Sequence, residues 1–130
     1  MTPVHETTRS AGADLRSAEP VTLEPQEVRL IGTGFSLAEL PHQADHDLVF
    51  MLCNRSSIAL KKSLMILNGV GVIDQDYKGE IKVMYMNMSG ERQTISKGEK
   101  IAQLVPMRYV TGIFENKDTE RSGGFGSTGS

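Results

Sequence analysis

Short apolar segments alternate with turn-forming residues along most of this chain. The segments are rich in Val, Ile, Leu and Met, and Gly, Pro and Asn-Gly turn signals separate them. They predict β-strands over residues 28–31, 48–53, 64–67, 71–73, 81–88, 93–95 and 101–106. Only residues 36–40 and 56–60 are typical of a helical turn, the second with Ser56 or Ser57 as its cap. Short strands at this spacing predict an all-β sandwich or barrel.

The segment 81–88 is apolar on both faces of its predicted strand. One face carries Ile81, Val83, Tyr85 and Asn87, and the other carries Lys82, Met84, Met86 and Met88. Because a sheet of a β-sandwich usually has one face in water, a strand that is apolar on both faces indicates a second cover. We expect a subunit interface to provide it.

Composition and charge narrow the class of protein. The chain has 130 residues, of which 38% are hydrophobic, as expected for one globular domain. Its 14 Lys and Arg against 16 Asp and Glu give a net charge of −2, which argues against a nucleic-acid binder with a broad basic surface. No long apolar run or signal-like start is present, so we expect a soluble cytoplasmic protein. The single cysteine, Cys53, excludes an intrachain disulfide and favours a small core residue.

The last ten residues differ in composition from the rest. Glycine and serine dominate, with one phenylalanine, Phe125, and Arg121 at the start. We therefore expect a β-domain over residues 1–120 and a flexible tail over 121–130. This tail is either a disordered end or a lid whose backbone N–H groups and hydroxyls wrap around phosphates while Phe125 stacks on a base.

Two internal segments carry candidate chemistry. Arg55, Ser56 and Ser57 follow a predicted strand and begin a helical turn, where N–H groups and a guanidinium suit an anion. The alternative is an ordinary serine cap beside a surface arginine. Farther along, Asp74 would act as a general base on water and Tyr77 would pack against a sugar. The alternative there is a hairpin with solvated turn acids.

Weaker candidates are Asp14 and the pair His42 and His46. Asp14 lies among small residues that also suit a turn before the first predicted strand. The histidines have a spacing of four residues, but no helical pattern supports a metal site, and a solvated loop is favoured.

Five segments in order resemble the motifs of the trimeric deoxyuridine triphosphate pyrophosphatase (dUTPase) family. They are Ala-Gly-Ala-Asp-Leu at 11–15, Arg-Ser-Ser at 55–57, Gly-Val-Ile-Asp-Gln-Asp-Tyr-Lys-Gly at 71–79, Gly-Glu-Lys-Ile-Ala-Gln-Leu at 98–104, and Gly-Gly-Phe-Gly-Ser-Thr-Gly at 123–129. The third and fifth are the most specific. The resemblance implies a jelly-roll-like β-clip subunit that forms a homotrimer, with active sites at the subunit junctions.

The resemblance also implies a reaction and a role for each matching residue. The reaction is hydrolysis of dUTP to dUMP and pyrophosphate, with Mg²⁺ on the triphosphate. Asp74 would activate the attacking water, and Asp14 would reach Mg²⁺ through water. The implied substrate-binding residues are Asn68 and the backbone around Gly71 for uracil, Tyr77 for deoxyribose, Arg55, Ser56 and Gln103 for the phosphate chain, Phe125 for stacking on uracil, and Arg121, Ser127 and Thr128 in the tail for the outer phosphates. Ser57, Ile73 and Gly126 are implied as further substrate contacts.

Some positions depart from the family pattern, and other functions stay open. Asn54 and Ser57 stand where the second motif usually has Pro and Gly, and the tail motif is one residue shorter after Arg121. Related alternatives are a dCTP deaminase or a bifunctional deaminase–diphosphatase. A different class is a non-catalytic nucleotide-sensing or protein-binding module on the same fold.

Overall fold

A computed structural model describes residues 2–40 and 47–117 of the chain, and strands dominate it. The elements are β1 (Val4–His5), β2 (Ala13–Arg16), β3 (Val21–Leu23), β4 (Val28–Gly32), the 3-10 turn η1 (Leu37–Glu39), β5 (Leu48–Asn54), α1 (Ser56–Lys62), β6 (Leu64–Ile66), β7 (Gly71–Asp74), β8 (Lys82–Asn87), β9 (Gln93–Ile95) and β10 (Lys100–Arg108). All the strands predicted from the sequence are confirmed, as β4 to β10, with ends shifted by at most two residues.

The first three strands were missed by the sequence pattern. β1 and β3 are too short to show alternation, and β2 contains the polar residues Asp14 and Arg16. Distant partners complete two of them, since β2 pairs with β10 and β3 pairs with β9, and β1 then pairs with the neighbouring β2. The interpretation of residues 11–15 as a turn is wrong, since Asp14 lies within a strand.

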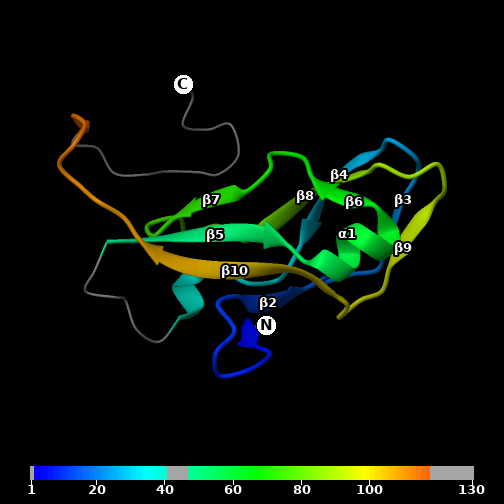
Figure 1. Cartoon of the computed structure of the whole chain (residues 1–130), viewed down its shortest axis with the longest axis horizontal. Coiled ribbons are helices and arrows are strands. Elements are labelled where there is room, and N and C mark those ends of the chain that lie inside the picture. The colour runs from blue at the N-terminus through cyan, green and yellow to red at the C-terminus, as the bar shows by residue number, and fades with distance from the viewer. Residues whose placement is uncertain (1, 41–46, 118–130) are drawn as a thin grey trace.

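The strands form two main antiparallel sheets and a small ribbon. The larger sheet has the order β1-β2-β10-β5-β7, the second sheet has the order β4-β8-β6, and β3 pairs with β9. Figure 1 shows α1 and the β3–β9 ribbon at one end of the molecule, while the segment after β10 leaves at the other end. The two sheets enclose one apolar core, which includes Leu15, Ile31, Leu52 and Val83. Cys53, expected as a small core residue, is half-buried and is not part of this core.

The hairpin considered for the segment around Asp74, residues 68–80, does not form. β6 pairs with β8 in one sheet, whereas β7 pairs with β5 in the other. The chain changes sheets through a turn in which the Gly69 N–H donates to the Ile66 carbonyl at 2.9 Å, with Gly69 at a φ of +77°. β7 is therefore an edge strand of the larger sheet.

Both predicted helical turns are present. In η1 the Ser36 hydroxyl accepts from the Ala38 N–H, and the Glu39 carboxylate accepts from the Ser36 N–H. In α1 the expected serine cap is wrong, because the N-cap residue is Arg55 and its side chain makes no capping bond. Among residues 2–40 and 47–117, none of the helices is long and apolar enough to cross a membrane.

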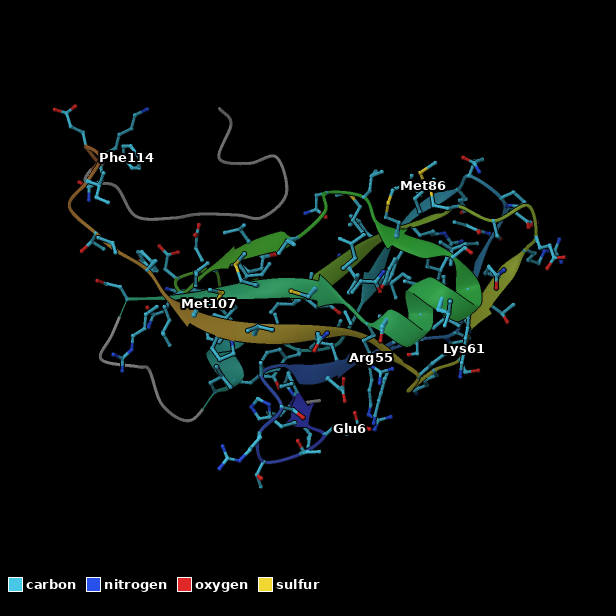
Figure 2. All side chains as sticks on the ribbon, in the orientation of Figure 1. Glu6, Arg55, Lys61, Met86, Met107 and Phe114 are labelled. Atoms are coloured by element: carbon cyan, nitrogen blue, oxygen red, sulfur yellow. The ribbon has the colours of Figure 1, made fainter. Side chains whose placement is uncertain are left out.

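The strand expected to be covered on both faces is covered on one face within the single chain. Val83 and Tyr85 are fully buried, whereas Met84 and Met86 on the opposite face are half-buried. We define the outer face of the β4-β8-β6 sheet by Val28, Leu30, Met65, Leu67, Met84, Met86 and Met88, and Figure 2 shows Met86 at this surface.

Candidate active site

Residues of strands β2 and β10, of the loop between β1 and β2, and of the start of α1 line a polar hollow. The hollow has a volume of about 180 Å³ and is lined by Glu6, Ser10, Gly12, Asp14, Arg55, Ser56, Ser57 and Gln103. Gln103 on β10 lies opposite Asp14 on β2, and on its other side β10 pairs with β5, which ends next to Arg55. Sheet pairing thus brings together motifs that are distant in the sequence.

Arg55 and Asp14 form the charged centre of this hollow. The Arg55 Nε donates to Asp14 Oδ1 at 3.1 Å, and its Nη1 donates to the Ser57 Oγ at 3.3 Å. The Lys100 Nζ lies 3.6 Å from Asp14 Oδ2. The side chains of Arg55 and Asp14 are only 21% and 12% exposed, so they face each other with limited screening by water. Figure 2 shows Arg55 beside the first turn of α1.

Gln103 is held close against the backbone of the first motif. Its Nε2 donates to the Asn54 carbonyl at 3.0 Å. A Cβ on Gly12 would lie 2.3 Å from Gln103 Oε1, so only glycine leaves room for this side chain. The amide is thereby held at the wall of the hollow.

Asp74 lies at the opposite end of the same sheet. It pairs with Val49 near the start of β5, whereas Arg55 directly follows Asn54 at the strand's end. Five residues of extended strand separate Val49 from Asn54, which corresponds to about 17 Å. The structure therefore does not bring Asp74 and Arg55 together within one chain.

Tyr77 is held in a compact turn after β7. Its N–H donates to the Asp74 carbonyl at 3.1 Å, and its hydroxyl donates to the Glu80 carbonyl at 3.2 Å. A Cβ on Gly79 would lie 2.6 Å from the Tyr77 hydroxyl. The Ser36 hydroxyl also donates to the Lys78 carbonyl at 2.9 Å, which anchors the turn on η1. The ring of Tyr77 is thus oriented before any ligand binds.

The remaining internal candidates lie near β7. Gly71 is buried, and an added Cβ would lie 3.0 Å from that of Leu52. Ile73 packs against the core, and Asn68 is exposed in the turn before β7.

Other candidates fall outside the described residues. These are Arg121, Phe125, Gly126, Ser127 and Thr128 of the tail, together with His42 and His46. Sequence reasoning missed Glu6 and Ser10, which line the hollow from the loop after β1 and carry no motif signal. Within the described part of the chain there is no cluster of three His, Cys, Asp or Glu side chains suited to a metal ion.

Comparisons with known proteins agree with this geometry. A family model described as dUTPase matches residues 2–129. The deoxyuridine 5'-triphosphate nucleotidohydrolase of Hahella chejuensis is 45% identical over 98% of this chain and 86% of its own length. A dUTPase from Streptococcus mutans has a TM-score of 0.75 at 30% identity, covering 88% of each chain. A variant dUTPase of phage phi11 of S. aureus, described for its coordination of a structural Mg(II) ion, has a TM-score of 0.75 at 26% identity, covering 94% of this chain and 92% of its own.

The match extends over almost the whole chain, and it includes all the segments that line the hollow and the turn that holds Tyr77. The strand-rich fold with two packed sheets agrees with the solved relatives. The chain belongs to the dUTPase family.

Proposed function

We propose that this protein hydrolyses dUTP to dUMP and pyrophosphate. Family membership supports this activity, and so does the polar hollow that joins Asp14, Arg55 and Gln103. A guanidinium, hydroxyls and an amide around one hollow are the donors that a chain of phosphates requires.

The phosphate chain of dUTP would bind in this hollow. Arg55 would give charge-assisted hydrogen bonds, and the Ser56 and Ser57 hydroxyls and N–H groups would donate at the first turn of α1. Gln103 would donate from the opposite wall. These donors bind the growing negative charge on the phosphates, so they lower the barrier to attack as well as the substrate dissociation constant.

Asp74 is the proposed general base. Its carboxylate would take a proton from a water as the water oxygen attacks the α-phosphorus, and the bond from that phosphorus to the bridging oxygen of the β-phosphate would break. Pyrophosphate is then the leaving group. Tyr77 would pack against the deoxyribose, and the backbone around Gly71, with Asn68 and Ile73, would contact uracil.

The distance between Asp74 and Arg55 carries a further part of the proposal. Because about 17 Å of strand separates their attachment points, one substrate cannot meet both side chains of one chain at the reacting phosphate. We therefore infer a homotrimer in which one subunit supplies Asp74 and Tyr77 while another supplies Arg55 and Gln103. The half-exposed outer face of the β4-β8-β6 sheet is an apolar surface suited to such contacts.

Mg²⁺ fits this site as a companion of the substrate. Asp14 is the carboxylate that pairs with Arg55, and its two oxygens lie near the cationic nitrogens of Arg55 and Lys100. A carboxylate in this position suits a hydrated Mg²⁺ held mainly by phosphate oxygens, with Asp14 reaching it through water. The ion would neutralise phosphate charge when bound.

The tail completes the proposal. Phe125 would stack on uracil, and Arg121, Gly126, Ser127 and Thr128 would bind the outer phosphates. With the tail over the site, bulk water would be excluded around the reacting phosphate, while the attacking water held by Asp74 stays in place.

Pyrophosphate release from dUTP, dCTP, dTTP and UTP tests the activity. We expect release from dUTP with Mg²⁺ and none from the others at equal concentration. Asp74→Asn keeps the shape of the side chain but removes the base, so turnover should fall at least a hundredfold while dUTP still binds.

The same assay separates the alternatives. Ammonia release from dCTP would place the protein among the deaminases or the bifunctional enzymes. Binding of dUTP without turnover of any nucleotide would leave a sensing module and would contradict the proposed function.

A further inference from the structure

The side chain of Tyr85 reaches from one sheet to the active-site end of the other. Tyr85 lies on β8, and its side chain is fully buried. Its hydroxyl lies 2.6 Å from Asn54 Oδ1 and 2.5 Å from the Ile101 carbonyl oxygen, so one proton is shared between two acceptors. Burial raises the pKa of this hydroxyl far above its ordinary value, despite the nearby charge of Arg55, so it stays a donor.

Ile101 needs this partner because it interrupts the sheet. The pairing of β10 with β2 shifts between Lys100 and Ala102, which marks a β-bulge at Ile101. A bulged residue leaves the regular ladder, and its buried carbonyl requires another donor. The Tyr85 hydroxyl supplies it, two residues before Gln103.

Asn54 connects Tyr85 to the phosphate-binding residues. Its side-chain Oδ1 accepts a hydrogen bond from the Arg55 backbone N–H at 2.8 Å, and its backbone carbonyl accepts one from Gln103 Nε2 at 3.0 Å. Its Nδ2 donates to the Leu64 carbonyl at 2.9 Å, which fixes the orientation of the amide. Within the described chain, Asn54 thus contacts both Arg55 and Gln103, which line the hollow from two elements.

We propose that Tyr85 and Asn54 are positioning residues for phosphate binding: the Tyr85 hydroxyl holds the Asn54 side chain and the Ile101 bulge, and Asn54 holds the Arg55 backbone and the Gln103 amide. This inference rests on the proposed function of the hollow. A phenylalanine at position 85 would fill the same core volume, so the hydroxyl serves the site and the ring serves the core.

The test compares Tyr85→Phe with a matched core variant, Val83→Ala. Val83 is fully buried on the same strand, two residues away and on the same face. For wild type and both variants, the measurements are KM and kcat for dUTP, the inhibition constant of deoxyuridine, and the midpoint of thermal unfolding. Deoxyuridine lacks phosphates, so its binding reports the base and sugar site alone.

We expect Tyr85→Phe to raise the KM for dUTP about fivefold or more, with a smaller fall in kcat and an unchanged inhibition constant for deoxyuridine. Val83→Ala should lower the unfolding midpoint and leave the KM unchanged. If Tyr85→Phe does not fold, Asn54→Ala carries the same expectation, since it removes the Oδ1 that accepts from the Tyr85 hydroxyl and the Arg55 N–H, together with the Nδ2 bond to the Leu64 carbonyl.

Three outcomes would overturn the inference. The first is an active wild type and a Tyr85→Phe variant whose KM changes less than about twofold. The second is an equal rise of KM in Val83→Ala, which would reduce the effect to general loosening of the core. The third is an equal loss of deoxyuridine binding. A wild type without dUTP turnover would instead overturn the proposed function, and the positioning role with it.

Discussion

Two inactive variants should restore activity when their chains are combined. Asp74→Ala removes the proposed base, and Arg55→Ala removes the proposed phosphate ligand at the far end of β5. About 17 Å of strand separates the two positions, so under the proposed function each active site takes them from different subunits. A mixed oligomer therefore contains some sites in which both side chains are intact.

The expected activity follows from random assembly. In an equal mixture, the chain that supplies Asp74 to a site is an Arg55→Ala chain with a chance of about one half. The chain that supplies Arg55 is an Asp74→Ala chain with the same chance, so about a quarter of the sites are complete. If one chain supplied both residues, no site would be complete. Wild type mixed equally with the double variant is the matched control. About a quarter of its sites are complete if two chains share each site, and about half are complete if one chain supplies both residues.

The assay is pyrophosphate release from saturating dUTP after the chains are unfolded together in urea and refolded. Variants refolded separately and then mixed without urea give the baseline. Sedimentation of each sample shows whether the oligomer has reformed. The division of the site between chains would be refuted if the reassembled mixture of the two single variants releases pyrophosphate only at the baseline rate while refolded wild type recovers its full rate.

Other changes should affect single features of the structure. Gly12→Ala should displace the Gln103 amide and raise the KM for dUTP in steady-state assays, because the new Cβ would lie 2.3 Å from Gln103 Oε1. The loss of thermal stability should be small, because this nearest atom ends a flexible side chain. Met86→Lys places a charge on the outer face of the β4-β8-β6 sheet and should yield single chains in sedimentation experiments. Burial by itself would raise the pKa of Glu99, but the ion pair with Lys62 at 2.9 Å and the hydrogen bonds of the carboxylate outweigh it, so the pKa lies below its ordinary value. The ionised Glu99 therefore stabilises the fold fully above its ordinary pKa, and this contribution is lost as the pH falls through the lowered pKa. Urea unfolding should thus show Glu99→Gln to be less stable than wild type at pH 7, with a smaller difference at about pH 4.

The strands that the sequence predicted are those with a strong local signal. β5 and β8 carry runs of Val, Leu, Met and Tyr long enough to show strand periodicity, and turn residues bound them. β2 has no such signal, since it has four residues of which Asp14 and Arg16 are charged, and its pairing with β1 and β10 makes it a strand. The false hairpin before Asp74 has the same origin: turn residues report that the chain reverses and do not report which sheet the next strand joins.

The candidate site divides in the same way. The motifs around Asp14, Arg55 and Gln103 could be recognised in the sequence because their residue types and order are distinctive. Their convergence around one hollow depends on the neighbouring positions of β2, β10 and β5. The hydrogen bond between Asn54 and Tyr85 was not predictable, since the two residues lie on different sheets.

The sequence by itself determined the class of fold and the family, because periodic apolar strands, turn residues and ordered motifs are local properties of the chain. Only the tertiary structure decided that Arg55 and Asp74 stand at opposite ends of one sheet, and that the Tyr85 hydroxyl reaches Asn54 across the core. The physical reason is that these relations depend on strand pairing and sheet packing between residues far apart in the chain, which short-range patterns do not encode.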